Sequence, residues 1–178
     1  TSPDCTCGTE RIASIVDELD AEIIVNVQGD EPMIEPELID NLISAALKSD
    51  ADMVTPVTKI NETSVLMSPN TVKVVRAFDG RALYFSRSPV PFIRGVDPGD
   101  WVQNSDFWLQ IGTYAFARNA LKEYTGWIET PLEALEKVEQ LRFLEHGKRI
   151  LTFAAESQSM AVDVPEDLER VRKYLAEK

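Results

Sequence analysis

The strongest fold signal in the sequence is the stretch Ile23-Ile24-Val25-Asn26-Val27-Gln28-Gly29-Asp30. Residues 23–27 form a mainly apolar run of strand length, and the polar residues Gln28, Gly29 and Asp30 follow it directly. Such a run is typical of a strand that is buried on both faces. It therefore predicts a strand of an α/β sheet that is covered on both sides.

Helix and strand patterns alternate on both sides of this stretch. Amphipathic or well-capped helices are expected after Gly8, from Pro36, from Thr130 to Gly147, and from Pro165. Further strands are expected at 53–57, 72–77, 82–86, 109–117, 150–154 and 160–164, and Asp79-Gly80 joins two of them as a hairpin. Because no linker divides the chain, we expect one domain over residues 1–178, a three-layer α/β/α sandwich with a mixed, mostly parallel sheet and a β-hairpin excursion.

Composition excludes several classes of protein. Eighteen basic against thirty acidic residues give a formal net charge of -12, which argues against binding to nucleic acid or to an anionic membrane. No apolar run approaches the roughly 20 residues of a membrane-spanning helix. Cys5 and Cys7 are the only cysteines and His146 is the only histidine, so the sequence favours neither a zinc site nor a disulfide framework. Reduced thiols and the lack of a signal peptide predict a cytoplasmic protein.

Two aspartates are candidate metal ligands. Asp30 follows the strand 23–27, and Asp163 lies near the end of the expected strand 160–164, just before Pro165. Open α/β sheets bind ligands at the carboxyl ends of their strands, and Mg²⁺ usually takes one or two protein carboxylates. An aspartate after a strand is also a common turn former or helix cap, and the pattern alone leaves both interpretations open.

A family resemblance adds to this pattern. The stretch Val25-Asn26-Val27-Gln28-Gly29-Asp30-Glu31-Pro32 resembles the strand-loop signature of the cytidylyltransferases that activate 3-deoxy-manno-octulosonate (Kdo), the acidic sugar of bacterial lipopolysaccharide. Similar blocks follow in family order: 1–4 with 8–11, Asn70-Thr71-Val72-Lys73-Val74-Val75, Ala82-Leu83-Tyr84-Phe85-Ser86-Arg87, Pro131-Leu132-Glu133, Glu139-Gln140-Leu141-Arg142 and Val162-Asp163-Val164-Pro165-Glu166-Asp167-Leu168.

The resemblance implies a nucleotide-diphospho-sugar transferase-like fold, usually dimeric, that joins CTP and Kdo into CMP-Kdo with release of pyrophosphate. By match to the family motifs, Asp30 and Asp163 would hold Mg²⁺ and serve catalysis. The residues that would contact the sugar acid are Gln28, Arg87, Gln110, Tyr114, Glu139 and Gln140, and those that would contact the nucleotide are Gly8, Thr9 and Arg11. Without the resemblance, Arg87 would be read as a surface ion-pair partner and Glu139 as part of a solvated helix face.

Three features depart from the family pattern. Family members begin with a strand and a basic, glycine-rich loop that cradles the triphosphate, and the sequence from Thr1 onward contains no such loop. We therefore expect weak CTP binding by this chain alone, and a preceding segment of the full protein that supplies the loop and the first strand. Gln110 stands where the family commonly has His, and an amide cannot titrate near neutral pH. Cys7 replaces a serine often found in the nucleotide loop, or is simply a small buried residue.

Other functions remain open at this point. A cytidylyltransferase for a related acidic sugar, such as 8-amino-Kdo or a nonulosonate, would share these motifs. A catalytically silent module could instead dimerise or bind a partner through the hairpin around Asp79-Gly80 and the segment 101–108. A magnesium-dependent phosphatase is a third class, although the sequence shows no aspartyl nucleophile motif.

Overall fold

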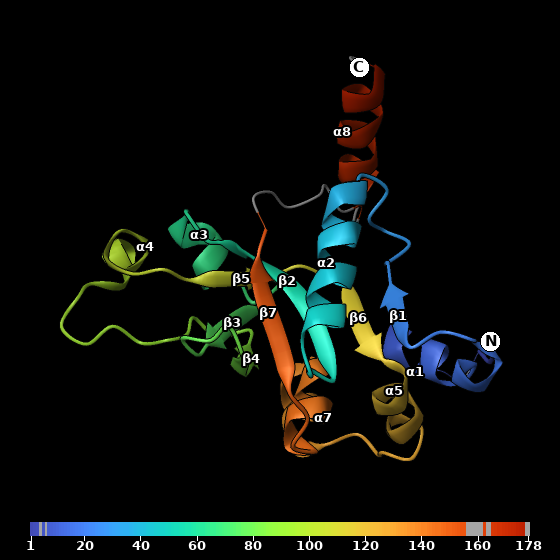
Figure 1. The fold of residues 1–178 in the computed structure, drawn as a ribbon. Coiled ribbons are helices and arrows are strands. Elements are labelled where there is room, and N and C mark those ends of the chain that lie inside the picture. Colours follow the sequence, from blue (N-terminus) through green and yellow to red (C-terminus); the bar gives the residue numbers. More distant parts are fainter. Residues whose placement is uncertain (4, 6, 156–161, 163–164, 177–178) are drawn as a thin grey trace.

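The computed structural model describes residues 1–3, 5, 7–155, 162 and 165–176 (Figure 1). Its helices are α1 (Gly8–Ala13), α2 (Pro36–Lys48), α3 (Thr63–Met67), α4 (Trp101–Asn104), α5 (Arg118–Tyr124), α6 (Pro131–Glu136), α7 (Gln140–Glu145) and α8 (Pro165–Ala176), with 3-10 turns η1 (Val16–Glu18) and η2 (Pro98–Asp100). Its strands are β1 (Ile23–Asn26), β2 (Met53–Lys59), β3 (Lys73–Arg76), β4 (Ala82–Ser86), β5 (Trp108–Gln110), β6 (Tyr114–Ala117) and β7 (Ile150–Ala154).

The sheet is mixed, as expected, but it is not mostly parallel. Among the described strands only β2 and β7 run parallel; the pairs β1–β6, β2–β6, β2–β5, β3–β5 and β3–β4 are all antiparallel. The prediction of a mostly parallel sheet was therefore wrong. It relied on burial of both strand faces, and helices cover both faces here although most neighbouring strands are antiparallel.

Helices cover both faces of the sheet, which gives three layers. One set of strand side chains packs against Leu42 and Ala46 of α2: Val25, Val54, Ala115 and Leu151. The alternate set packs with buried side chains of α1, α5 and α7: Ile24, Met53, Phe116 and Ile150. Successive side chains of a strand point to opposite faces, so these two sets define the two faces of one sheet. Figure 1 shows α2 lying across one of these faces.

The sheet divides where β5 passes into β6: both strands pair with β2, but they lead to different neighbours, and we call this point the fork. Val54 pairs with Ala115 and Val57 with Gln110, so the stretch 111–114 lies opposite only the two residues between Val54 and Val57. This excess is a bulge, which interrupts pairing and redirects the strand. Beyond the bulge, β6 pairs with β1 while β5 pairs with β3. The single strand predicted at 109–117 is therefore two strands separated by an irregular segment.

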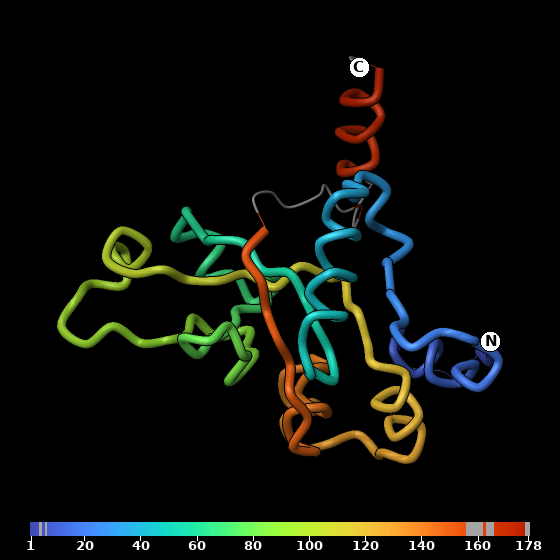
Figure 2. Tube along the Cα trace, viewed as in Figure 1, coloured from blue at the N-terminus to red at the C-terminus, as the bar shows by residue number. Residues whose placement is uncertain are grey.

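A smaller lobe extends from the β3–β4 side of the fork (Figure 2). The predicted hairpin is confirmed, with Gly80 at φ +85° in its turn. A Cβ on Gly80 would stand 2.9 Å from the Thr152 carbonyl oxygen, so glycine is required there both for φ and for space. The lobe has its own apolar core, which includes Leu66, Trp101 and Phe107.

One expected helix in the C-terminal half differs from the structure, and one expected strand there is not tested by it. The helix expected from Thr130 to Gly147 is divided into α6 and α7, because Lys137 adopts the left-handed conformation with φ 52°. The strand expected at 160–164 lies outside the described residues apart from Val162.

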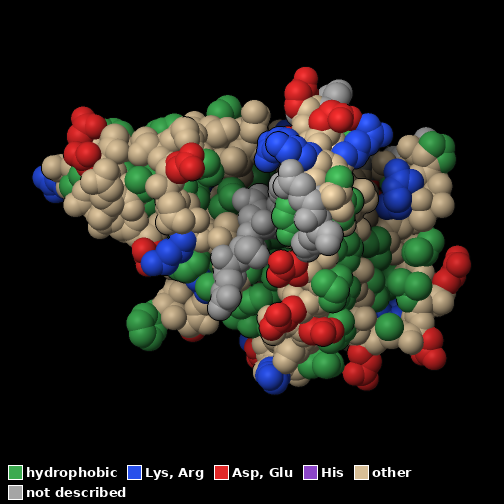
Figure 3. Space-filling view, turned by 90° about the horizontal axis from the view of Figure 1, so that it is seen from above, with side chains coloured by type: hydrophobic (Ala, Val, Ile, Leu, Met, Phe, Trp, Pro, Cys, Tyr) green, Lys and Arg blue, Asp and Glu red, His purple; other side chains and the backbone are tan. Residues whose placement is uncertain are grey.

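The chain's acidic character is visible at its surface. Seen from above, acidic side chains are spread over the face in Figure 3 rather than gathered in one place. Within the described residues, no helix combines the length and apolar character needed to cross a bilayer.

Candidate active site

The bulge at the sheet fork is held by buried hydrogen bonds. The Thr55 hydroxyl lies 3.2 Å from the Ile111 carbonyl oxygen and 3.1 Å from that of Thr113, and Thr55 is fully buried. The Gln110 backbone N–H donates to the Val72 carbonyl at 2.9 Å. These bonds compensate backbone groups that the interrupted ladder leaves unpaired.

Gln110 and Tyr114 flank the bulge and contact each other. The Gln110 Nε2 atom donates to the Tyr114 hydroxyl oxygen at 2.8 Å. Burial raises the pKa of Tyr114 above its usual range, and the negative charge of Glu139 raises it further. The phenol therefore stays neutral at physiological pH, available as a hydrogen-bond donor as well as an acceptor.

A cavity of about 620 Å³ opens beside this pair, between the fork and the helices α6 and α7. Five of the six side chains predicted to contact a sugar acid line it: Arg87, Gln110, Tyr114, Glu139 and Gln140. They come from the end of β4, the two strands at the bulge, and the start of α7. The fold thus brings together residues that are far apart in the sequence.

The break between α6 and α7 places two of these side chains. With Lys137 in the left-handed conformation, α6 ends and the chain turns before Glu139 begins the next helix. The Glu139 carboxylate accepts a hydrogen bond from the Thr9 backbone N–H at 3.4 Å, which connects the cavity wall to α1. Gln140 follows in the first turn of α7 and is only 2% exposed.

Gln28, the sixth predicted sugar contact, lies between two glycines. A Cβ on Gly8 would stand 3.3 Å from Asn26 Nδ2 and 3.4 Å from Gln28 Nε2, while one on Gly112 would stand 3.8 Å from Gln28 Cγ. Gln28 therefore lies between α1 and the bulge, although it is not part of the cavity lining.

The predicted nucleotide contacts are divided. Gly8 and Thr9 lie at the start of α1, and Thr9 is fully buried beside Glu139. Arg11 is exposed, and its guanidinium donates to the Thr1 hydroxyl and the Ser2 carbonyl rather than lining the cavity.

Only one of the two predicted metal ligands, Asp30, lies among the described residues. Asp30 is exposed just beyond β1, and its backbone carbonyl accepts a hydrogen bond from the Val162 N–H at 2.7 Å. Asp163 lies outside the described residues. Among the residues that are described, no group of three or more His, Cys, Asp or Glu side chains is arranged to hold a metal ion.

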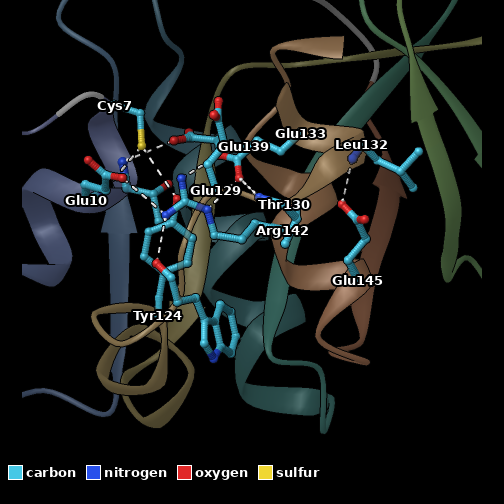
Figure 4. A network of polar contacts seen from close by, with 12 residues as sticks. Cys7, Glu10, Tyr124, Glu129, Thr130, Leu132, Glu133, Glu139, Arg142 and Glu145 are labelled. Carbon is cyan, nitrogen blue, oxygen red and sulfur yellow. Dashed lines mark hydrogen bonds and ion pairs between the residues drawn. The ribbon is translucent and has the colours of Figure 1, made fainter. Parts of the chain in front are cut away.

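A buried ion-pair network in the cavity wall was not predicted from the sequence (Figure 4). Arg142 on α7 donates through Nε and Nη2 to the two carboxylate oxygens of Glu133 on α6, at 2.6 and 2.7 Å. Its Nη1 atom also reaches Glu10 of α1 at 3.2 Å, and its guanidinium lies over the Tyr124 ring. Thr130 was predicted as the start of a helix and Glu133 as part of a family motif. The Glu133 carboxylate accepts from the Thr130 backbone N–H, but its ion pair with Arg142 had no signal in local spacing.

Cys7 belongs to the same region of the cavity wall. Its sulfur accepts from the Glu10 backbone N–H at the start of α1 and lies 3.6 Å from the Tyr124 hydroxyl. Burial raises the pKa of Cys7 to about 11, and the negative charge of Glu139 adds to the increase. The Cys7 thiol is therefore protonated at neutral pH.

Several buried polar atoms in this region have no partner among the described residues. They include Gln140 Nε2 in the cavity lining and, outside the lining, Thr9 Oγ1, Asn26 Nδ2 and Thr113 Oγ1. Buried polar groups are normally hydrogen-bonded, and unpaired ones cluster at sites that bind a polar ligand or water. Gln140 Nε2 and the mixed charges of the lining thus offer polar contacts to a ligand in the cavity.

The chain is similar to known cytidylyltransferases. Residues 1–150 match the family model described as Cytidylyltransferase. The chain is 40% identical over 181 residues to the 3-deoxy-manno-octulosonate cytidylyltransferase of Porphyromonas gingivalis, covering 98% of this chain and 71% of that one. It is 43% identical over 178 residues to the enzyme of the same name from Chlamydia pneumoniae, covering 98% and 67%.

A solved structure agrees in fold. CMP:2-keto-3-deoxy-manno-octonic acid synthetase, complexed with CTP, superposes with a TM-score of 0.88 at 34% identity. The match covers 98% of this chain and 70% of that structure.

Proposed function

Because the chain belongs to the 3-deoxy-manno-octulosonate cytidylyltransferase family, we propose that it transfers the cytidylyl group of CTP to Kdo and releases pyrophosphate. The observation that carries the proposal is the cavity at the sheet fork, lined by the side chains expected to contact the sugar acid. The family motifs name these residues, and the fold brings five of them to one cavity.

The reaction needs no nucleophile from the protein. The anomeric hydroxyl oxygen of Kdo forms a bond to the α-phosphorus of CTP, the bond from that phosphorus to the bridging oxygen breaks, and the hydroxyl proton is released as pyrophosphate leaves. Catalysis of such a transfer consists mainly of positioning and charge stabilisation. These are the tasks that the side chains of the cavity can perform.

Arg87 is the proposed ligand of the sugar carboxylate. Its Nε, Nη1 and Nη2 atoms each donate one hydrogen bond to a backbone carbonyl, which leaves one N–H on each terminal nitrogen. Two N–H groups on a planar fork suit bidentate binding of a carboxylate.

Four further side chains are proposed to orient the sugar hydroxyls. Gln110 and Tyr114 offer an amide and a neutral phenol that already hydrogen-bond to each other. Glu139 accepts and Gln140 both donates and accepts at the start of α7. We assign Gln28 to the same sugar site and Gly8, Thr9 and Arg11 to the nucleotide, as the family motifs imply.

Asp30 and Asp163 are the proposed holders of Mg²⁺. The donor chemistry fits this ion: Asp30 presents an exposed carboxylate after a strand end, and Mg²⁺ takes few protein ligands. The Val162–Asp30 hydrogen bond supports a pairing with Asp163, the next residue in the sequence. When bound, Mg²⁺ would neutralise charge on the triphosphate and on the leaving pyrophosphate.

Turnover with a panel of sugar acids tests the proposal. Pyrophosphate release with CTP and Mg²⁺ is expected to give its highest kcat/KM with Kdo, compared with 8-amino-Kdo and a nonulosonate. Asp163→Asn and Asp30→Asn should reduce turnover to background, while Asp50→Asn, at an exposed partner of Arg149, should leave it unchanged.

Two results would redirect the proposal. Preference for one of the other acids by the folded protein would assign a related sugar, consistent with Gln110 in place of histidine. Failure to turn over any of them, at CTP concentrations high enough to saturate the weak binding expected for this chain, would favour a catalytically silent module.

Other expectations from the family remain predictions. We expect a homodimer in solution, a role in lipopolysaccharide synthesis and a cytoplasmic location. Light scattering coupled to size exclusion would measure the first directly.

A further inference from the structure

Arg87 is fixed at both its backbone and its side chain. Its backbone N–H donates to the Glu136 carboxylate at 2.9 Å, and its backbone carbonyl accepts from the Lys73 ammonium. Its Nε atom donates to the Glu136 carbonyl at 2.7 Å. A side chain held in this way loses little further conformational entropy when it binds a ligand.

Glu136 connects the end of α6 to the end of β4. One of its carboxylate oxygens accepts from the Ser86 hydroxyl at 2.7 Å, while the other accepts from the Arg87 N–H. Because α6 ends at Glu136, its last carbonyls are free of intrahelical partners, and Arg87 donates to those of Glu136 and Lys137. The left-handed turn at Lys137 thus directs these carbonyls toward Arg87.

Lys73 holds the other side of Arg87. It is fully buried, and its ammonium donates to the carbonyls of Ser68 and Thr71, both at 2.8 Å, as well as to that of Arg87. The loop 68–71 that it fixes carries the Pro69 carbonyl, which accepts from Arg87 Nη1 at 3.0 Å. Lys73 therefore determines where two of the partners of Arg87 lie.

We propose that Glu136 and Lys73 are positioning residues that hold Arg87 in the orientation that binds the carboxylate of the acidic sugar. The identity of that ligand rests on the proposed function; the positioning of Arg87 does not. Neither residue lines the cavity, so both would act through Arg87.

Two replacements of Glu136 separate positioning from charge. Glu136→Ala removes both carboxylate contacts and should weaken Kdo binding roughly 10-fold, the loss expected when hydrogen bonds involving a charged group are removed. Glu136→Gln should restore affinity to within about two-fold of wild type, because its amide oxygen can accept from Arg87 N–H and its amide nitrogen can donate to Ser86 Oγ. Affinity for CTP should be the same in both.

Glu169→Ala is the matched control, since Glu169 lies on α8 in an exposed ion pair with Arg172. Affinities are measured by calorimetric titration of Kdo in the presence of CTP and Mg²⁺, and thermal melts confirm that each variant is folded. Lys73→Met, which keeps a long buried side chain, is the second variant and should also weaken Kdo binding selectively.

A second readout needs no ligand. Exchange of the Arg87 Nε–H proton with solvent can be followed by NMR, and its signal is identified because it is absent from Arg87→Lys. This exchange should be slow in the wild type and faster in Glu136→Ala. The inference would be overturned if Glu136→Ala exchanged this proton as slowly as the wild type. It would also be overturned if the wild type bound Kdo and Glu136→Ala bound it equally well. A wild type that does not bind Kdo would refute the proposed function, and the exchange comparison would still decide whether Glu136 positions Arg87.

Discussion

At the scale of single residues, Gln110 connects the bulge to the proposed sugar site. Its amide donates to Tyr114 and lines the cavity, where the family commonly has histidine. We expect Gln110→His to change KM for Kdo while kcat stays close to the wild-type value, because the residue orients the sugar rather than the reacting phosphate. Steady-state kinetics with Kdo varied at saturating CTP measures both constants.

Gln103→His, at an exposed position of α4, is the control for this change. An unaltered KM for Kdo in Gln110→His would show that Gln110 does not touch the sugar.

Lys73 makes stability depend on pH. Burial lowers the pKa of Lys73 from 10.5 to about 8, and the positive charge of Arg87 adds to this while Glu136 opposes it. Between about pH 8 and 10.5 the unfolded chain therefore binds more protons than the folded protein, so the Lys73 contribution to stability rises with pH in this window. Below pH 8 that contribution is constant.

Urea unfolding of wild type and Lys73→Met from pH 7 to 9.5 measures this contribution as a difference. The free energy of unfolding of the wild type should rise relative to the variant above pH 8. Parallel profiles would mean that Lys73 keeps its ordinary pKa in the folded protein.

The residues of the site were predictable to different degrees. Arg87, Glu139 and Gln140 could be named from motifs, and the fold brings them to one cavity. Arg142 and Glu133 could not be paired, because their contact depends on how α6 and α7 fold back on each other rather than on a helical spacing.

At the scale of elements, the Arg142–Glu133 pair joins α7 to α6. Both side chains are buried, at 4% and 7% exposure. We expect Glu133→Ala to lower the free energy of unfolding by roughly 3–5 kcal/mol, because it leaves the Arg142 charge buried without its main partner. Equilibrium denaturation monitored by tryptophan fluorescence measures the change.

Glu123→Ala provides the comparison. Glu123 pairs with Lys148, and its side chain is half exposed. This control should cost no more than about 1 kcal/mol. Equal losses in the two variants would contradict a special role for the buried pair.

The division of α6 from α7 shows what local sequence could not reveal. Thr130 and Pro131 gave the correct start of the helix, but a lysine at 137 carries no sign of a left-handed residue. A non-glycine residue in that conformation costs on the order of 1 kcal/mol, so it persists only where tertiary contacts favour it. The carbonyls of Glu136 and Lys137 bound by Arg87 are such contacts.

At the scale of the whole molecule, apolar patterns predicted the layers but not the strand directions. The run 23–27 and the helix expected from Pro36 correspond to β1 and α2, although β1 lies at an edge of the sheet among the described strands. Strand direction depends on how the connections between strands cross the sheet. The segment 108–117 passes beside β2, and both of its strands, β5 and β6, pair with β2 in antiparallel orientation. The fork that this segment creates is the feature on which the site depends.

Side-chain amide NMR can show whether the acidic sugar binds in the cavity at the fork. Gln110 and Gln140 amide signals, assigned with Gln→Glu variants, are followed while Kdo is added in the presence of CTP and Mg²⁺. We predict saturable shifts of both signals, with that of the exposed Gln103 unmoved. Saturable Kdo binding that shifts other signals and leaves Gln110 and Gln140 unchanged would contradict binding in this cavity.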